Sequence, residues 1–312
     1  MRKNFLFNCY EDKDGKIIRE YLYGLFKTKR GKILKHFYFL GIKFLVLPLF
    51  GLEAIRFKLE DCFINIAKWN ARLLTASIIN KGFLEYKGIY RGKTVVLVGA
   101  GPTVNNFIPI KDAIYVGCNR AFLFDKVKFD YLFAIDKVGI EKFYDEFFNY
   151  DCIKFIGDQN LGESYQIPED KIPLSNNIHR YITDAGFFIN QSYPADISTL
   201  PLHNPPTVSL QALQFILYTQ PAKVYLVGID CTNATQGHFE GKSNDISKRS
   251  ENLSINDITN VQEFIKIKSF AKTYYPSTEI ISINPVGLKG IFNDIYTNNN
   301  GYIDKKGNPL VL

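Results

Sequence analysis

Residues Arg91–Val104, RGKTVVLVGAGPTV, contain the clearest structural signal in the chain. Thr94–Val98 is a run of β-branched and apolar residues, which is typical of a parallel strand buried on both faces. The strand runs into a turn with two glycines, Gly99 and Gly101, whose backbone can approach a phosphate or a ribose closely. This stretch therefore predicts a buried strand followed by a ligand-binding turn.

The same pattern recurs along the chain. Polar residues follow three of the expected strands, as Asn119, Asp136 and Asp230 show, and the carboxyl ends of parallel strands are where such a sheet binds its ligand. Alternating strands and helices predict an α/β fold with a doubly wound parallel sheet. Further strands are expected at 113–117, 131–135, 223–227 and 279–283, and helices at 207–218 and 265–275.

The glycine turn does not fit the common nucleotide motifs. A dinucleotide site requires G-x-G-x-x-G and an acidic residue after the second strand, but this chain has Val104 and Asn119 at those positions. A methyltransferase site lacks the same acidic residue, and no G-K-[ST] follows the glycines, which excludes a Walker A loop. The remaining alternatives are another nucleotide ligand and a turn with a purely structural role.

Composition and charge narrow the class of protein. Of the 312 residues, 46% are apolar and 22% are charged, which excludes a disordered chain and a disulfide-stabilised miniprotein. Five scattered cysteines indicate reduced thiols in the cytoplasm and argue against a zinc site. The whole net charge of +7 lies within residues 1–60, which contain 13 Lys and Arg and 6 Asp and Glu. This placement argues against a nucleic-acid partner and favours contact of residues 1–60 with an anionic membrane.

The N-terminal segment includes an apolar run, FYFLGIKFLVLPLFGL, at 37–52. The run is shorter than the roughly 20 residues needed to span a bilayer, and it contains Lys43 and Pro48. Two interpretations remain, a helix lying in the membrane interface and an ordinary buried helix. We therefore divide the chain into a basic, mainly helical N-terminal extension, 1–90, and a nucleotide-binding Rossmann-like catalytic domain, 91–312.

Four segments, taken in order, resemble the bacterial sialyltransferases of the Campylobacter type: GAGPT at Gly99–Thr103, GCNRAF at Gly117–Phe122, TVSLQALQFILYTQPAKVYLVGID at Thr207–Asp230 and INPVGLKGIF at Ile283–Phe292. They also look like the related domain of flagellin motility-accessory glycosyltransferases and of MptE-like pterin pyrophosphokinases. The resemblance covers about residues 94–296 and none of the first ninety. It implies a Rossmann-like fold of the GT-A-type variant that binds a nucleotide sugar.

The resemblance also implies where a CMP-sugar donor would bind. Three positions depart from the family, because Ala100 and Asp136 replace asparagines and Thr232 replaces a tyrosine. The residues expected around the donor are Gly99, Ala100, Gly101, Thr103, Asn119, Asp136, Thr207, Gly228, Asp230 and Thr232.

Transfer of a sugar with inversion needs a base that takes the proton of the acceptor hydroxyl. The family places a histidine before the last helix, but residues 241–264 contain none. We expect His238 to be the base, with His203 next and Asp230 as the third candidate. His238 lies in a polar stretch, and the residues after it, 240–260, are long enough to form a lid over the substrate.

Metal-dependent glycosyltransferases usually carry D-x-D, because paired carboxylates hold a cation against a diphosphate. The D-x-D of this chain is Asp12-Lys13-Asp14, in the N-terminal segment and away from the expected sheet. We therefore expect no metal and no cofactor. A donor with one phosphate is consistent with this, because hydroxyls and backbone N–H groups can stabilise its departing charge.

The sequence thus predicts a metal-independent, inverting glycosyltransferase that uses a CMP-activated acidic sugar to extend a bacterial surface glycan or glycolipid, such as lipopolysaccharide or capsule. We expect it in the cytoplasm, peripherally at the inner face of the cytoplasmic membrane. Two alternatives stay open. One is an MptE-like pyrophosphokinase that uses ATP, with Asp136 and Asp230 as Mg²⁺ ligands, and the other is a non-catalytic nucleotide-binding module of a glycan assembly complex. The oligomeric state is open, and a homo-oligomer is compatible with the sequence.

Overall fold

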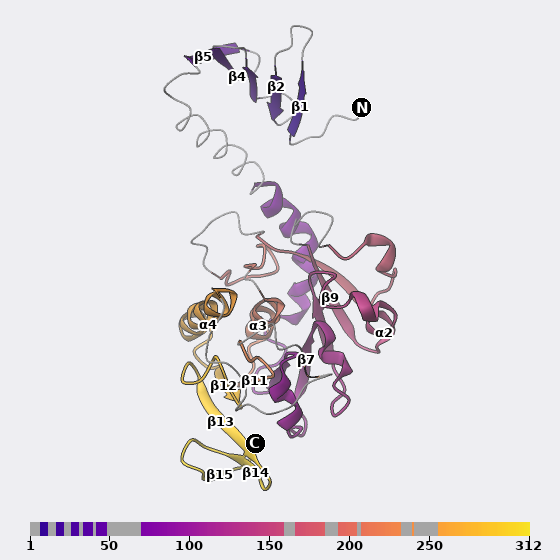
Figure 1. Cartoon of the computed structure of the whole chain (residues 1–312), viewed down its shortest axis with the longest axis vertical. Coiled ribbons are helices and arrows are strands. Elements are labelled where there is room, and N and C mark those ends of the chain that lie inside the picture. The colour runs from indigo at the N-terminus through magenta and orange to yellow at the C-terminus, as the bar shows by residue number, and fades with distance from the viewer. Residues whose placement is uncertain are drawn as a thin grey trace. The chain divides into compact units, whose positions relative to one another are not determined.

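In the computed structural model the chain divides into two compact units, Met1–Leu74 and Thr75–Leu312 (Figure 1). Within these units the structure describes residues 7–11, 17–21, 26–30, 34–39, 42–48, 70–158, 166–184, 193–204, 207–231, 239 and 255–312.

The first unit contains a five-stranded antiparallel sheet whose strands lie in chain order. Within the described part of 1–90, helix occurs only at 70–79 and in the short element that follows it. The prediction of a mainly helical extension is therefore wrong for the described residues of this unit. Short runs of alternating character, such as FKTKR, suit a strand better than a helix. The strands are β1 (Phe7–Glu11), β2 (Ile17–Tyr21), β3 (Phe26–Arg30), β4 (Leu34–Phe39) and β5 (Ile42–Pro48).

The apolar run at 37–52 forms neither of the two expected helices. Its described residues belong to β4 and β5, which pair with Phe39 opposite Ile42. Residues 40, 41 and 49–52 of the run lie outside the described part. Among the residues that the structure describes, no helix is both long and apolar enough to cross a bilayer.

The second unit is built on one ten-stranded, mostly parallel sheet with the order β10-β9-β8-β7-β6-β11-β12-β13-β14-β15. Neighbouring strands are parallel from β10 to β13, and β14 and β15 are antiparallel. The predicted α/β class with a parallel sheet is confirmed. The strands are β6 (Thr94–Val98), β7 (Ile114–Cys118), β8 (Tyr131–Ala134), β9 (Ile153–Asp158), β10 (Ile178–Ile182), β11 (Lys223–Val227), β12 (Glu279–Ile283), β13 (Asn293–Asn298), β14 (Gly301–Ile303) and β15 (Pro309–Leu310).

Helical elements cover both faces of this sheet. Alternate residues of a strand point to opposite faces, so Val95 and Leu97 belong to one buried cluster and Val96 and Val98 to the other. The first cluster also includes residues of η2 (Asn80–Tyr86), α3 (Val208–Tyr218) and α4 (Ile255–Tyr274). The second cluster includes or contacts residues of η3 (Pro102–Asn106), η4 (Asn119–Leu123), η5 (Glu141–Phe143) and α2 (Tyr144–Asn149). The short η6 (Glu169–Lys171) precedes β10.

The larger unit begins earlier than the boundary expected at residue 90. Phe83 and Tyr86 of η2 are buried in the aromatic cluster on the sheet. Asn80 is 1% exposed. Its side chain donates hydrogen bonds to the carbonyls of Ile182 and Leu200, at 3.3 and 2.9 Å, and accepts one from the Ile182 N–H at 2.8 Å. These contacts attach η2 to the end of β10.

We expect Asn80→Ala to destabilise the larger unit by about 2 kcal/mol or more, because each buried backbone group left unpaired costs about 1–3 kcal/mol. Urea unfolding followed by circular dichroism measures the loss, and hydrogen exchange of the Ile182 amide should accelerate. Lys81→Ala, an exposed neighbour in η2, is the control and should leave both unchanged. Equal stability of the two variants would show that the hydrogen bonds of Asn80 do not stabilise the attachment of η2 to β10.

Candidate functional site

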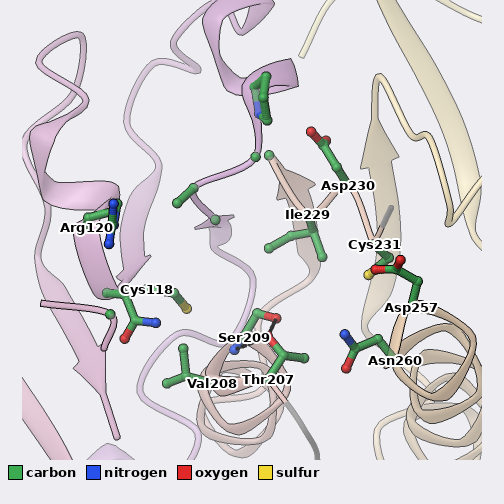
Figure 2. A pocket seen from close by; sticks show the side chains of 17 residues that line it. Cys118, Arg120, Thr207, Val208, Ser209, Ile229, Asp230, Cys231, Asp257 and Asn260 are labelled. Carbon is green, nitrogen blue, oxygen red and sulfur yellow. Dashed lines mark hydrogen bonds between the residues drawn. The ribbon is translucent and has the colours of Figure 1, made fainter. Parts of the chain in front are cut away.

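A pocket of about 290 Å³ lies at the carboxyl ends of β6, β7 and β11 (Figure 2). Strand order reverses between β6 and β11, because the chain continues from β6 toward β10 on one side and from β11 toward β13 on the other. Open α/β sheets bind their ligands in the crevice at such a reversal. The pocket is lined by Gly99–Pro102, Cys118–Arg120, Gly139, Thr207–Ser209, Gly228–Cys231, Asp257 and Asn260.

The glycine turn after β6 is packed tightly against the loop after β11. The N–H groups of Gly99 and Gly101 donate to the carbonyls of Val227 and Gly228, both at 2.8 Å. A Cβ atom on Gly99 would lie 2.6 Å from the Gly228 carbonyl oxygen, and one on Gly101 would lie 2.5 Å from Asp230 Oδ2. Glycine is therefore needed for the approach of two loops, and these two N–H groups are used inside the protein rather than offered to a phosphate.

Asp230 joins the same two loops through its side chain. Its carboxylate accepts a hydrogen bond from the Thr103 hydroxyl and another from the Thr103 N–H at 3.3 Å. Asp230 is 7% exposed and lines the pocket, whereas Thr103 is buried and does not line it. The loop turns sharply here, since Gly228 and Cys231 both have positive φ, 64° and 46°. The structure thus places Thr103 as a support for Asp230.

Asn119 contributes an unpartnered oxygen to the wall beyond β7. The residue has a φ of 50°, in the left-handed region, and its Oδ1 atom is buried without a hydrogen-bond partner. Gly139 fits closely against it, because a Cβ there would lie 2.4 Å from Asn119 Cγ. The Gly139 N–H donates to Asp136 Oδ1 at 3.0 Å. Asp136 does not line the pocket and instead holds the turn that supports Asn119.

The N-terminus of α3 forms the base of the pocket. Thr207 is the N-cap, and its hydroxyl accepts from the Ser209 N–H at 3.4 Å and lies 2.9 Å from the Ser209 hydroxyl. The first turn of an eleven-residue helix presents backbone N–H groups and the positive end of its dipole. Thr207, Val208 and Ser209 all line the pocket, so this wall is suited to an anionic group such as a phosphate.

The fourth wall comes from α4, through Asp257 and Asn260. Sequence reasoning missed both residues, because the helix was expected to begin at residue 265 and its first turns were assigned to a polar loop. The helix begins at Ile255. The i, i+3 spacing of the two polar residues is the signal that could have found them, since it places both on one helix face.

Burial keeps the two thiols of the pocket protonated. It raises the pKa of Cys118, and it raises the pKa of Cys231, where the negative charges of Asp230 and Asp257 raise it further. A thiolate nucleophile is therefore not available at either position at neutral pH.

Of the three base candidates, Asp230 lines the pocket and His238 lies outside the described residues. Thr232, which was expected to bind the donor, also lies outside them. His203 does not line the pocket. Its Nδ1 lies 2.7 Å from Asp184 Oδ2 and its Nε2 lies 3.2 Å from Glu263 Oε2. Burial lowers the pKa of this imidazole, but the hydrogen bonds and charges of the two carboxylates outweigh burial, and the pKa is raised. Both ring nitrogens are thus already engaged.

Among the described parts of the chain, no group of three His, Cys, Asp or Glu residues is arranged to hold a metal ion. The pocket contains two carboxylates, Asp230 and Asp257.

Comparison with known proteins found no matching family model and no matching curated protein. Two similar solved structures are of the sialyltransferase CstII from Campylobacter jejuni, one in complex with the substrate analogue CMP-3FNeuAc and one with cytidine-5'-monophosphate. The first is 16% identical, with a TM-score of 0.35, and the match covers 61% of this chain and 80% of that one. The second is 15% identical, with a TM-score of 0.37, and covers 62% and 80%. A TM-score below 0.5 does not establish a common fold, so the fold and site of this chain rest on its own strand order and pocket.

We expect Gly101→Ala to destabilise the second unit by about 1–3 kcal/mol, the usual cost of overpacking, because the added methyl meets Asp230 and a backbone carbonyl. Thermal unfolding measures the effect. The matched control is Gly82→Ala, whose Cβ would lie 3.8 Å from its nearest neighbour, His179 Nδ1. That distance is an ordinary van der Waals contact. A Gly101→Ala variant as stable as Gly82→Ala would show that the two loops are not locked together.

The raised pKa of His203 predicts a pH-dependent contribution to stability. A folded-state pKa above the ordinary value of 6.5 means that the contribution is complete below about pH 6.5 and is lost as pH rises through the folded-state pKa. We therefore expect the difference in unfolding free energy between the wild type and His203→Gln to shrink from pH 6 to pH 9. Urea titrations at each pH test this, and a constant difference would contradict it.

Proposed function

We propose that this protein is an inverting glycosyltransferase of the GT-A-type variant that transfers an acidic sugar from a CMP-activated donor without a metal ion. Its product would be an extended bacterial surface glycan. The observation that carries the proposal is one pocket, at the reversal of strand order, that combines the N-terminus of α3 with the buried, unpartnered Oδ1 atom of Asn119.

The donor would be held at two points. The phosphate would lie at the N-terminus of α3, where the dipole and the hydroxyls of Thr207 and Ser209 favour a negative charge. Asn119 Oδ1 can accept a hydrogen bond from a ribose hydroxyl or from the amino group of cytosine. One helix terminus matches a donor with one phosphate, and the order of the four segments that resemble sialyltransferases supports the same donor.

In the proposed reaction the acceptor hydroxyl attacks the anomeric carbon of the sugar as the bond to the phosphate oxygen breaks. The proton of that hydroxyl goes to a protein base, and CMP leaves with the bonding electron pair. The terminus of α3 stabilises the departing phosphate. Asp230 and His238 are the candidates for the base. His203, with both ring nitrogens engaged, would act at most by fixing Asp184 and Glu263.

Metal independence is part of the proposal, and the arrangement of carboxylates supports it. Asp230 accepts two hydrogen bonds from Thr103, and Asp136, the second Mg²⁺ ligand that a pyrophosphokinase would require, accepts from Gly139 and does not line the pocket. The pair of ligands expected for the kinase alternative, Asp136 and Asp230, is therefore not brought together at this pocket. No observation favours a non-catalytic module over the enzyme.

The acceptor would be a glycan or glycolipid growing at the inner face of the cytoplasmic membrane. The charge of +7 within residues 1–60 supports this location, because a basic segment is attracted to anionic lipid headgroups.

Titration calorimetry of the full chain with CMP, in EDTA and in Mg²⁺, tests the donor class. We expect binding of CMP that is unchanged by EDTA, and weaker binding of UDP and of ATP with Mg²⁺. Binding only of ATP with Mg²⁺, or of no nucleotide, would overturn the proposal.

Asn119→Ala should weaken CMP binding about tenfold, because one buried hydrogen bond is lost and about 1.4 kcal/mol corresponds to a factor of ten. The matched control, Asn299→Ala, removes an exposed amide outside the pocket and should bind CMP as the wild type does. Equal affinities of the two variants would show that Asn119 does not contact the nucleotide.

A further inference from the structure

The inner face of α4 is polar where it meets the pocket and apolar farther along the helix. Farther along the helix this face is apolar, with Phe264, Ile267 and Ala271 buried in the core. In the first two turns it presents Asp257 and Asn260 to the pocket instead. Figure 2 shows both side chains projecting from α4, on the side of the pocket opposite Cys118 and Arg120.

Asn260 brings an unsatisfied acceptor to this face. Its Oδ1 atom is buried and has no hydrogen-bond partner. A buried acceptor without a donor is costly, and a ligand that donates a hydrogen bond to this atom would remove the cost. A partner made of hydroxyl groups would satisfy an amide oxygen, whereas another anion would not.

Asp257 makes the same wall acidic. It is 3% exposed, and its charge, like that of Asp230, raises the pKa of the Cys231 thiol, so both carboxylates lie close to that side chain. Two buried carboxylates beside an amide oxygen form a surface of hydrogen-bond acceptors. Such a surface binds O–H donors and repels a ligand carboxylate.

The walls of the pocket follow the order of the parts of a nucleotide sugar. Asn119 belongs to the wall beyond β7, and α4 forms the opposite wall. Thr207 and Ser209, at the positive end of α3, lie between them, where the phosphate is proposed to bind (Figure 2). The group beyond the phosphate would therefore face α4.

We infer that Asp257 and Asn260 form a hydroxyl-binding subsite for the sugar of the donor, and that the sugar turns its hydroxyl groups toward α4 and its carboxylate away from it. This inference rests on the proposed nucleotide-sugar donor. It makes Asp257 and Asn260 specificity-determining residues that recognise the sugar and not the nucleotide.

The test compares the affinity for CMP with that for the substrate analogue CMP-3FNeuAc in the full-length protein. Asn260→Leu and Asp257→Asn should each bind the analogue about tenfold more weakly than the wild type and CMP equally well. Gln262→Ala, an exposed amide on the same helix, should bind both ligands as the wild type does. Because Asn260 Oδ1 has no partner in the free protein, Asn260→Leu should not lower the melting temperature.

The sign of the Asp257→Asn effect is decisive. If the sugar carboxylate faced α4, removing the charge of Asp257 would tighten binding of the analogue, and that result would overturn the inference. Unchanged affinity of both variants for the analogue, an equal loss for CMP, or a lower melting temperature of Asn260→Leu would also overturn it. If the wild type binds neither ligand, the proposed function itself fails, and the inference fails with it.

Discussion

The contact between the loop after β6 and the loop after β11 is the constraint on which the site depends. The Gly101 N–H donates to the Gly228 carbonyl at 2.8 Å, and the Thr103 hydroxyl and N–H donate to Asp230. These bonds continue the pairing of two parallel strands beyond their last residues. Because a Cβ on Gly101 would collide with Asp230, glycine fixes the distance between the loops and so the shape of the pocket.

The second support of the site is α3, which is buried on every side. Its polar side chains are used inside the protein, since Gln211 accepts from the Tyr181 hydroxyl and Gln214 bonds to the backbone of His203. His203 in turn contacts a carboxylate of α4, Glu263. A helix held this firmly presents its N-terminus at a fixed place, and a pre-organised dipole stabilises a developing charge without rearrangement.

Two residues that line the pocket carry features that lower the stability of the fold. Asn119 is held at a positive φ with a buried, unpartnered oxygen, and Asn260 carries a second such oxygen. Asn80, by contrast, uses its buried amide in three hydrogen bonds. The two asparagine oxygens at this pocket suit a binding site, because activity requires groups that the folded protein leaves for a ligand.

Local patterns in the sequence were sufficient for the parallel α/β sheet and for the pocket residues Gly99, Asn119, Thr207 and Asp230, because buried strands and the polar residues after them are contiguous in the chain. They failed for the first unit, where cross-strand pairing in β1–β5 replaces the expected helices. They also missed β9, β10 and β13–β15, and they gave a catalytic candidate, His203, that does not line the pocket.

Tertiary packing of α4 beside α3 decided which polar residues reach the site, and it brought in Asp257 and Asn260. No periodicity within a segment encodes such contacts, because they depend on how distant helices meet on the sheet.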